Sequence, residues 1–315
     1  MKAKDFLSIA DLAVEDVSRV VLRADRMKKG ESTDILKGKV VVLLFEKPSL
    51  RTRVSFEVGI RQMGGDCVYL SSQDVGLGVR ESEADVARVL DRWVDGIVAR
   101  VNSHRSLEIL AENTSVPVVN ALSDLEHPCQ AMGDLLTIYE HKGRLDGLRV
   151  AFVGDGNNTA ASLALACASV GADFVLACPD GYELPSSVLG EAERRASTSG
   201  SSVERVADPL EAVRDADVVY TDVWTSMGQE SESVDRLKAF AGYQVNEQLM
   251  RGAKSDAIFM HDMPAHRGEE ISEGMIDHSS SVVFDQAENR MHGQKAVLGE
   301  LFLQGEGGSR TAPTA

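Results

Sequence analysis

Cysteine is scarce in this sequence, and its spacing excludes two common uses of the residue. None of the four cysteines forms a C-x-x-C pair, and all of them lie in stretches of apolar or small residues. This pattern argues against a zinc site and against a disulfide framework, and a reducing cytosol is the simplest setting for it. The four are Cys67, Cys129, Cys167 and Cys178.

Long apolar runs are also missing. The segment from Met1 to Ser8 lacks the continuous apolar region of a signal peptide, and no later run approaches the length of a membrane span. We therefore expect a soluble, cytoplasmic protein without a membrane partner.

Basic residues are in deficit. The chain has 33 Lys and Arg against 49 Asp and Glu, which gives a formal net charge of −16. Most of its surface would repel a nucleic-acid backbone or an anionic membrane, so we expect no nucleic-acid partner. Any site for an anion must be a local basic exception.

What is present is the composition of an ordinary globular protein. Hydrophobic residues make up 43% and charged residues 26%, and the length of 315 residues fits two domains. Short apolar, β-branched segments recur and alternate with helix-like stretches. This alternation predicts an α/β fold with two domains, each a mostly parallel sheet flanked by helices, and functional loops at the carboxyl ends of the strands. The expected strands are 40–45, 96–100, 116–120, 149–153, 173–177, 217–221, 257–260 and 281–284.

A polar, glycine-containing segment at 141–147 follows a helical pattern at 131–139 and marks the expected domain boundary. The first domain would cover 1–141 and the second 148–286, with the active site in the cleft between them. The tail from 305 to 315 has almost no apolar content, so we expect it to be disordered.

The segment Ser49-Leu50-Arg51-Thr52-Arg53 follows the first buried strand and opens a helical pattern that ends at Gly64-Gly65. A helix N-terminus exposes unpaired N–H groups and positive charge, to which these side chains add hydroxyl and guanidinium donors. The sequence therefore predicts a phosphate-binding loop. Alternatively, Ser49 only caps the helix and the arginines are solvated.

Three further polar residues follow neighbouring predicted strands, and we expect them to converge on this loop. Arg100 and His127 could polarise a carbonyl oxygen, and the amide of Gln130 could hold an amino group. Alternatively, His127 before Pro128 stabilises a turn.

The second half contains a strand followed by Gly154-Asp155-Gly156-Asn157-Asn158. Thr159 stands where the third glycine of a dinucleotide fingerprint would be, so we favour a small-molecule site contacted by Asn158 over NAD. Asp222 and Asp262 follow later strands, and their charge suits an ammonium-bearing substrate, although either could cap a helix instead.

Taken in order, these motifs resemble the ornithine carbamoyltransferases. The match rests on Ser-x-Arg-Thr-Arg, His-Pro-Cys-Gln, Gly-Asp-Gly-Asn-Asn, Asp-x-Trp-x-Ser-Met-Gly and Ala-Glu-Asn-Arg, and runs from about Phe6 to Leu303. The resemblance implies carbamoyl transfer from carbamoyl phosphate to ornithine without metal or other cofactor. It also implies a carbamoyl-phosphate domain joined by a C-terminal helix at about 287–304, an ornithine domain, and a homotrimer or an assembly of trimers.

The resemblance also implies roles for individual residues. Its phosphate-binding residues correspond to Ser49, Leu50, Arg51 and Thr52, and its carbamoyl-binding residues to Arg100, His127, Gln130 and Arg290. Its amino-acid-binding residues correspond to Asn158, Asp222, Ser226, Met227, Asp262 and Met263. Of these, Arg100, His127, Asp222 and Asp262 would be catalytic.

Three positions depart from the family pattern. Leu50 replaces a threonine, which matters little if that position contributes its backbone N–H. Gly76 stands where relatives often carry glutamine or histidine, a side chain that reaches a neighbouring subunit. Asp262 and Met263 replace a cysteine and a leucine, and a carboxylate at 262 would attract the reacting amine but also favour its unreactive protonated form.

Two other substrates and two other classes of protein stay open at this stage. Pro48-Ser49-Leu50 also occurs among relatives that act on N-acylornithines, and putrescine is another possible amine. A dehydrogenase would bind NAD at Gly154–Asn158. A non-catalytic assembly subunit would be expected to have lost its polar site residues.

Overall fold

The computed structural model describes residues 4–31, 34–226 and 230–305. The chain forms two compact units, which we call the first unit (residues 4–129 and 291–305) and the second unit (residues 130–290). It passes from one to the other inside two helices, α6 (Pro128–Lys142) and α12 (Val283–Gly305). Among the described residues, no helix combines the length and apolarity needed to cross a membrane.

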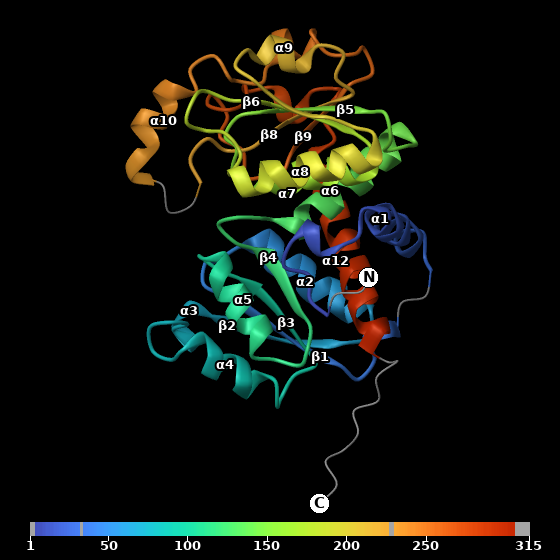
Figure 1. Ribbon diagram of the computed structural model, residues 1–315, viewed down its shortest axis with the longest axis vertical. Coiled ribbons are helices and arrows are strands. Elements are labelled where there is room, and N and C mark those ends of the chain that lie inside the picture. Colours follow the sequence, from blue (N-terminus) through green and yellow to red (C-terminus); the bar gives the residue numbers. More distant parts are fainter. Residues whose placement is uncertain (1–3, 32–33, 227–229, 306–315) are drawn as a thin grey trace, which may run out of the picture. The chain divides into compact units, whose positions relative to one another are not determined.

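The first unit contains a four-stranded parallel sheet in the order β2-β1-β3-β4 (Figure 1). Helices α4 and α5 pack on one face through a cluster that includes Val42, Leu44, Leu90 and Leu107. Its strands are β1 (Val40–Phe45), β2 (Asp66–Ser71), β3 (Gly96–Arg100) and β4 (Val118–Leu122); its helices are α1 (Val14–Lys28), α2 (Leu50–Gln62), α3 (Ser72–Val75), α4 (Glu83–Leu90) and α5 (His104–Glu112), with 3-10 turns η1 (Ile9–Asp11) and η2 (Asp34–Leu36).

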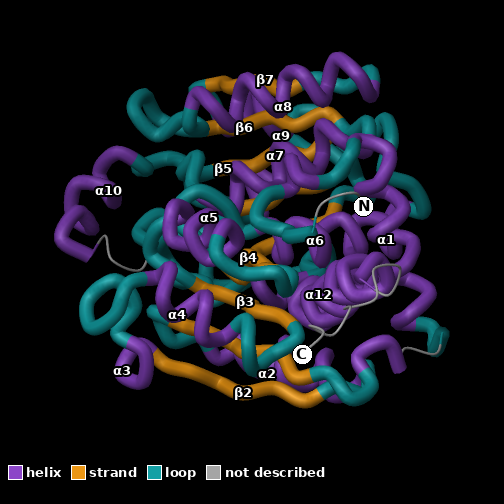
Figure 2. The backbone as a smooth tube through the Cα atoms, turned by 60° about the horizontal axis from the view of Figure 1, so that its bottom comes forward, coloured by secondary structure: helices purple, strands orange, loops and turns teal. Residues whose placement is uncertain are grey.

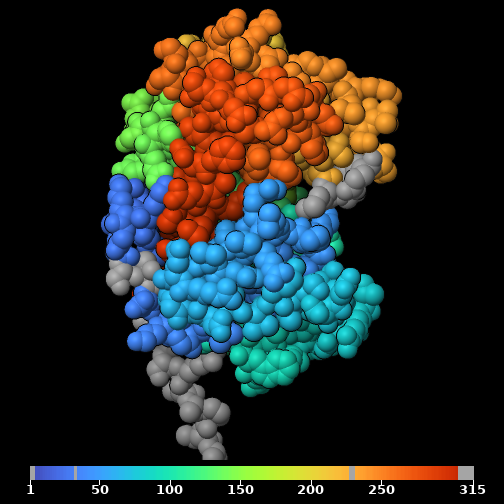
Figure 3. Space-filling model, turned by 180° about the vertical axis from the view of Figure 1, so that it is seen from behind, coloured from blue at the N-terminus to red at the C-terminus, as the bar shows by residue number. Residues whose placement is uncertain are grey.

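The C-terminal half of α12 packs in the first unit beside α1, from the opposite end of the sequence (Figure 3). The buried carboxylate of Glu300 lies 2.5 Å from a guanidinium nitrogen of Arg19 and 2.8 Å from one of Arg23. Because one buried carboxylate receives two arginines, this contact is a firmer tie than an isolated surface ion pair.

The second unit contains a five-stranded parallel sheet in the order β7-β6-β5-β8-β9, of which Figure 2 labels β7, β6 and β5. In Figure 1, α7 and α8 lie on one face of this sheet and α9 on the other. The strands are β5 (Arg149–Val153), β6 (Asp173–Ala177), β7 (Val203–Val206), β8 (Val218–Thr221) and β9 (Ile258–His261); the helices are α7 (Asn158–Val170), α8 (Ser186–Ser199), α9 (Pro209–Val213), α10 (Ser233–Ala239) and α11 (Glu247–Met250), with 3-10 turns η3 (Glu230–Glu232) and η4 (Met275–Asp277).

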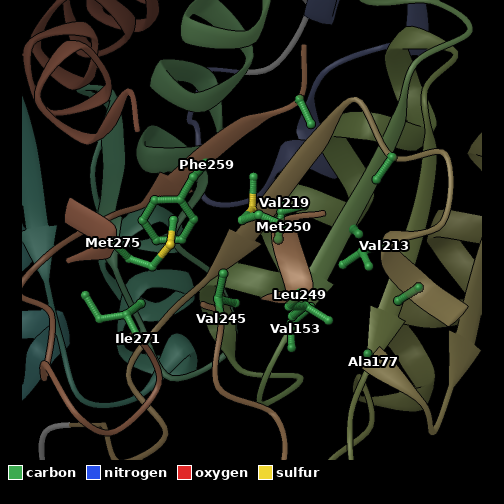
Figure 4. Close-up of a cluster of buried hydrophobic side chains, with 14 of the residues drawn as sticks. Val153, Ala177, Val213, Val219, Val245, Leu249, Met250, Phe259, Ile271 and Met275 are labelled. Atoms are coloured by element: carbon green, nitrogen blue, oxygen red, sulfur yellow. The ribbon is translucent and has the colours of Figure 1, made fainter. Parts of the chain in front are cut away.

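Hydrophobic side chains from several of these elements form one buried cluster, which we call the hydrophobic cluster (Figure 4). Val153 and Val219 come from neighbouring strands, Val213 from α9 and Phe259 from β9. Each of these four side chains is fully buried, as expected for a parallel sheet covered on both faces.

The predicted α/β class with two parallel sheets is confirmed, and seven of the eight predicted strands correspond to observed strands. The predicted strand 116–120 is displaced by two residues and 257–260 by one, and 217–221 begins one residue too early. The prediction of a strand at 281–284 was wrong, because α12 begins at Val283 and only Ser281 forms a bridge, to Phe259. Strands β2 and β7 were missed; both lie at sheet edges and are at least partly exposed, and β7 also lacks a continuous apolar run.

The division into units lies earlier in the chain than the polar segment at 141–147 that the sequence suggested as a boundary. It falls between residues 129 and 130, inside a helix that continues to Lys142, and again between 290 and 291 inside α12. Close packing at Gly133 helps to explain why the first turns of α6 belong to the second unit. A Cβ at this position would lie only 2.8 Å from the Cα of Arg290 on α12. The backbones of α6 and α12 therefore meet within the second unit. Residues 306–315 of the predicted tail lie outside the described chain.

Candidate functional site

The carboxyl ends of the strands of the first unit carry a group of residues that we call the basic edge: Ser49, Arg51, Thr52, Arg100 and His127. The last residue of β1, Phe45, pairs with Arg100, the last of β3, and Arg100 pairs with Leu122 of β4. The backbone N–H of Glu46 donates to the carbonyl of Arg100 at 2.9 Å. The loop after β1 therefore starts beside Arg100, as the sequence predicted.

Ser49 caps α2, so part of the alternative interpretation is correct. The N–H of Thr52 donates to Ser49 Oγ at 3.4 Å, and the Ser49 hydroxyl donates to Thr52 Oγ1 at 2.9 Å. The first turn of α2 contains no acidic residue that would neutralise the positive end of the helix. A capped, uncompensated helix N-terminus is compatible with an anion in front of it.

Of the two arginines in this turn, the structure separates one from the basic edge. Nε of Arg53 lies 2.7 Å from Glu57, and its guanidinium lies 3.7 Å from the centre of the Tyr69 ring. Arg53 is therefore held by a salt bridge and a cation–π contact along α2. Arg51, two residues earlier, is half-buried.

Arg100 brings a buried positive charge to this edge. Its side chain is 5% exposed, and Nη1 donates to the hydroxyl of Thr52 at 3.4 Å. A guanidinium in such surroundings is only partly hydrated, so it interacts with an anion more strongly than an exposed one.

His127 is buried at the end of the loop that follows β4. The loop is fixed by Glu126, whose N–H donates to Ser123 Oγ at 3.2 Å and whose carboxylate accepts the Ser8 hydroxyl at 2.5 Å. The turn thus has its own support, so stabilisation by His127 is not needed to explain it.

Residues that follow β5, β8 and β9 form a second group, which we call the acidic edge: Asn157, Asp222 and Asp262. Register pairs Thr221 with His261, so the following residues, Asp222 and Asp262, leave the sheet side by side. One ligand atom from each of Asp222, His261 and Asp262 lies within 4.8 Å of the others. Neither aspartate begins a helix in the described chain, which removes the capping alternative.

Asn157 was not predicted, yet it contacts this edge. Its Oδ1 accepts the N–H groups of Thr159 and Ala160 and so caps α7, while its Nδ2 donates to Asp222 Oδ2 at 2.8 Å. The predicted Asn158 is the first residue of α7 and is half-buried.

Burial and the carboxylate of Asp222 raise the pKa of Asp262 well above its ordinary value, while Arg290 acts in the opposite direction. Nη2 of Arg290 donates to the backbone carbonyl of Asp262 at 2.7 Å. Arg290 therefore joins the acidic edge through the backbone.

The glycine turn after β5 has a structural explanation that does not involve a dinucleotide. A Cβ on Gly156 would lie 2.5 Å from the carbonyl carbon of Glu183, so only glycine fits there. Asp155 accepts a hydrogen bond from Arg236 Nη1 at 2.7 Å. The turn is thus used for backbone packing and a buried salt bridge.

The remaining predicted residues are placed as follows. Met263 packs against the hydrophobic cluster of the second unit and has a left-handed backbone, with φ of 60°. Ser226 is half-buried, and Met227 lies outside the described residues. Gln130 is buried in α6 and donates to Asp134 at 2.7 Å. Gly76 has φ of 60° and a Cβ there would lie 2.9 Å from that of Arg80, so this loop is built around glycine.

Two clusters in the described chain bring together three groups of the kind that bind metals, and we assign a metal to neither. In the first, Asp222–His261–Asp262, the imidazole is occupied: Nδ1 accepts the N–H of Met263 at 2.9 Å and Nε2 lies 3.2 Å from Glu270. In the second, His266 and Glu269 already face each other at 3.6 Å near the surface.

Comparison with known proteins gives the same family for both parts of the chain. Residues 4–140 match the carbamoyl-P binding domain of aspartate/ornithine carbamoyltransferase, and residues 146–301 match its Asp/Orn binding domain. The chain is 52% identical over 302 residues to ornithine carbamoyltransferase of Thermococcus kodakarensis, covering 95% of this chain and 96% of the relative. It is 50% identical over 302 residues to a relative from Pyrococcus furiosus named ornithine carbamoyltransferase, anabolic, covering 95% and 96%.

Solved structures agree. Ornithine carbamoyltransferase from Pyrococcus furiosus superposes with a TM-score of 0.90 at 50% identity, over 93% of this chain and 95% of that one. A mutant N-acetyl-L-ornithine transcarbamylase superposes with a TM-score of 0.85 at 30% identity, over 95% and 100%. With both domains matched over nearly their whole length, the chain belongs to the aspartate/ornithine carbamoyltransferase family.

Proposed function

We propose that this protein transfers the carbamoyl group of carbamoyl phosphate to the δ-amine of L-ornithine, giving L-citrulline and phosphate. The observation that carries the proposal is identity of about 50%, over nearly the whole chain, to relatives named ornithine carbamoyltransferase. The two edges fit this chemistry, because one offers donors to an anion and the other offers carboxylates to an ammonium group.

The basic edge would bind carbamoyl phosphate. The N-terminus of α2, with Ser49, Leu50, Arg51 and Thr52, would hold the phosphate. Leu50 is 75% exposed, so its contribution would be its backbone N–H rather than its side chain. Arg100 and His127 would donate to the carbonyl oxygen, and Gln130 and Arg290 would surround the rest of the carbamoyl group.

The acidic edge would bind ornithine. Asp222 and Asp262 would orient the δ-amine and help to remove its proton, while Asn158, Ser226, Met227 and Met263 would contact the rest of the amino acid. Burial raises the pKa of Asp262, so its carboxylate accepts a proton more readily than an ordinary aspartate does. This suits the reaction, because the attacking nitrogen must lose a proton to become neutral.

The reaction balances without a redox or metal cofactor. Ornithine loses one proton from its δ-ammonium, and the neutral nitrogen attacks the carbonyl carbon. Arg100 and His127 stabilise the oxyanion while the C–N bond forms. The C–O bond to phosphate then breaks, and the second proton leaves nitrogen for a phosphate oxygen. Carbamoyl phosphate would bind first, because its charge lowers the positive potential of the basic edge before the cationic amino acid arrives.

The proposal includes a cytoplasmic homotrimer, or an assembly of trimers, that serves arginine biosynthesis. The relative named anabolic supports the biosynthetic direction. The family resemblance of the sequence supports the trimer, and sedimentation analysis of the purified protein would test it.

The decisive test is a carbamoylation assay with carbamoyl phosphate and, in parallel, ornithine, putrescine, N-acetylornithine and N-succinylornithine. We expect ornithine to be preferred. Preference for another amine would contradict the substrate assignment but keep the reaction. No product with any amine would favour a non-catalytic assembly subunit, and NAD binding in a thermal-shift titration would favour a dehydrogenase.

A further inference from the structure

The second unit contains a fully buried carboxyl group that the proposed reaction does not use. Asp134 lies on α6, one turn after Gln130, and has no exposed surface. Its Oδ1 accepts Nε2 of Gln130 at 2.7 Å and Nε2 of Gln286 at 2.8 Å, and its Oδ2 accepts the hydroxyl of Tyr220 at 3.2 Å. Helix α6, helix α12 and strand β8 thus meet at this single side chain.

These contacts fix which way the amide of Gln130 faces. An amide has one donor end and one acceptor end, and Asp134 Oδ1 can pair only with the donor end. Oε1 of Gln130 is therefore turned away from Asp134. It is buried and accepts no hydrogen bond within the described chain. A buried acceptor without a partner is unfavourable in the empty protein and becomes favourable when a ligand supplies an N–H.

The acceptor atom Oδ1 is itself held in place. Nε2 of Gln286 also donates to the hydroxyl of Tyr220 at 2.9 Å, and its Oε1 accepts the N–H of His261 at 2.9 Å. Gln286 can therefore not turn its amide without losing the hydrogen bond from the N–H of His261. His261 directly precedes Asp262 in the chain. The orientation of Gln130 is thus linked through two side chains to the backbone of the acidic edge.

We propose that Asp134 is a positioning residue, which holds Gln130 so that its Oε1 accepts a hydrogen bond from the NH₂ of the carbamoyl group. The consequence is selectivity for a carbamoyl over an acetyl group, which has the same shape but a methyl in place of NH₂. This inference rests on the proposed function, since it takes the carbamoyl group as the ligand of Gln130.

The arrangement does not require Asp134 to be charged. Burial raises the pKa of Asp134 to about 6, although the hydrogen bonds from both glutamines and the charge of Arg290 act to lower it. A proton on Oδ2 would be donated to the hydroxyl of Tyr220, and Oδ1 would stay an acceptor. The same holds for Asp134→Asn with its NH₂ at the Oδ2 position, so that variant preserves the orientation of Gln130.

The test compares two stable inhibitors, phosphonoacetamide and 2-oxopropylphosphonate, which differ only in NH₂ against CH₃. The readout is the ratio of their inhibition constants, in which effects on the shared phosphonate cancel. We expect Asp134→Leu, which removes the acceptor, to lower the selectivity for phosphonoacetamide roughly tenfold, as for one buried hydrogen bond. Asp134→Asn should stay within about twofold of the wild type.

Thr137→Val is the matched control. Thr137 is also fully buried on α6, but it bonds the carbonyl of Gly133 and Asn289 instead of Gln130. Thr137→Val should lower the stability of the protein and leave the ratio of the two inhibition constants unchanged. The inference is wrong if a folded Asp134→Leu keeps the wild-type ratio, or if Asp134→Asn loses as much as Asp134→Leu.

If Asp134→Leu does not fold, Gln130→Met replaces it, since methionine has a similar shape and no amide. A loss of selectivity in Gln130→Met together with retention in Asp134→Asn supports the inference, and a wild-type ratio in Gln130→Met overturns it. Failure of the proposed function is distinguishable, because it appears as absence of citrulline in the wild-type assay, whatever the inhibitor ratio.

Discussion

The two edges meet the charge of their ligands in opposite ways. At the basic edge, the positive end of α2 and the guanidinium of Arg100 are supported by neutral hydroxyl groups, Ser49 and Thr52. At the acidic edge, the buried carboxyl of Asp222 and the partly buried carboxyl of Asp262 lie next to each other, and the nearby arginine bonds a backbone carbonyl instead of a carboxylate. The basic edge is ready for an anion as it stands, whereas the acidic edge holds like charges together and becomes favourable once a cation arrives.

The largest effect is expected at the basic edge. Arg100→Ala removes a donor to the developing oxyanion and should lower kcat by about 10²–10³. The measurement is citrulline formation at saturating substrates, with Arg105→Ala as the control. Arg105 pairs with Glu108 on the surface of α5, and its loss should leave turnover unchanged. A rate within a few-fold of the wild type for Arg100→Ala would show that the basic edge does not depend on this residue.

The second effect concerns the position of Arg290 at the acidic edge. Gly133→Ala would place a Cβ 2.8 Å from the Cα of Arg290 and should push α12 away from α6. Overpacking of this kind costs about 1–3 kcal/mol, which would lower Tm by roughly 2–4 °C for each kcal/mol.

Gly190→Ala is the control for this substitution. Gly190 lies in α8 with nothing within 4 Å of an added Cβ, so alanine should stabilise the protein by about 0.5–1 kcal/mol through its higher helix propensity. Equal changes in Tm for the two variants, measured by thermal unfolding, would mean that close packing at Gly133 is not what the chain requires.

The third effect tests the repulsion between the carboxylates of Asp222 and Asp262. Because burial and Asp222 raise the pKa of Asp262 in the folded protein, folding binds a proton and stability falls as pH rises above the unfolded pKa. Asp262→Asn keeps the shape without the charge, so its gain in Tm over the wild type should be smallest below about pH 4 and grow as the pH rises above that value.

A control of opposite sign is available on the surface. The pKa of Asp256 is lowered by Lys142, so Asp256→Asn should lose a little stability at neutral pH and progressively less as the pH falls below about 4. A flat difference in Tm between Asp262→Asn and the wild type across this pH range would remove the like-charge description of the acidic edge.

The sequence predicted the parts of the fold that depend on local signals. Strands β1, β3, β5 and β6 have the predicted bounds, because buried parallel strands are continuous apolar runs with clear ends. The edge strand β7, Val-Glu-Arg-Val, has only four residues and two charges, so no local pattern marks it. The start of α12 reads as β-branched sequence but is helical in the structure.

For the candidate site, the sequence indicated which residues are polar at strand ends but not how they pair. That Asn157 contacts Asp222 depends on the local geometry at the start of α7, which a pair of asparagines in the sequence does not reveal. Asp134 has an ordinary helical position in the sequence, and its role depends on contacts with Gln286 and Tyr220, far along the chain. Long-range pairing of this kind requires a structure.

The smallest effect is expected for Arg53, which the sequence included in the predicted phosphate-binding loop. Ser49–Arg53 contains two arginines, but Arg53 is bound to Glu57 and stacked on Tyr69. Arg53→Ala should therefore change KM for carbamoyl phosphate by about twofold or less, as for the loss of a surface ion pair. Arg51→Ala, one half-turn away on the same helix, should raise it much more, because a guanidinium bound to phosphate makes strong, charge-assisted hydrogen bonds. Similar changes in KM for the two variants would place Arg53 at the basic edge and weaken the distinction drawn between them.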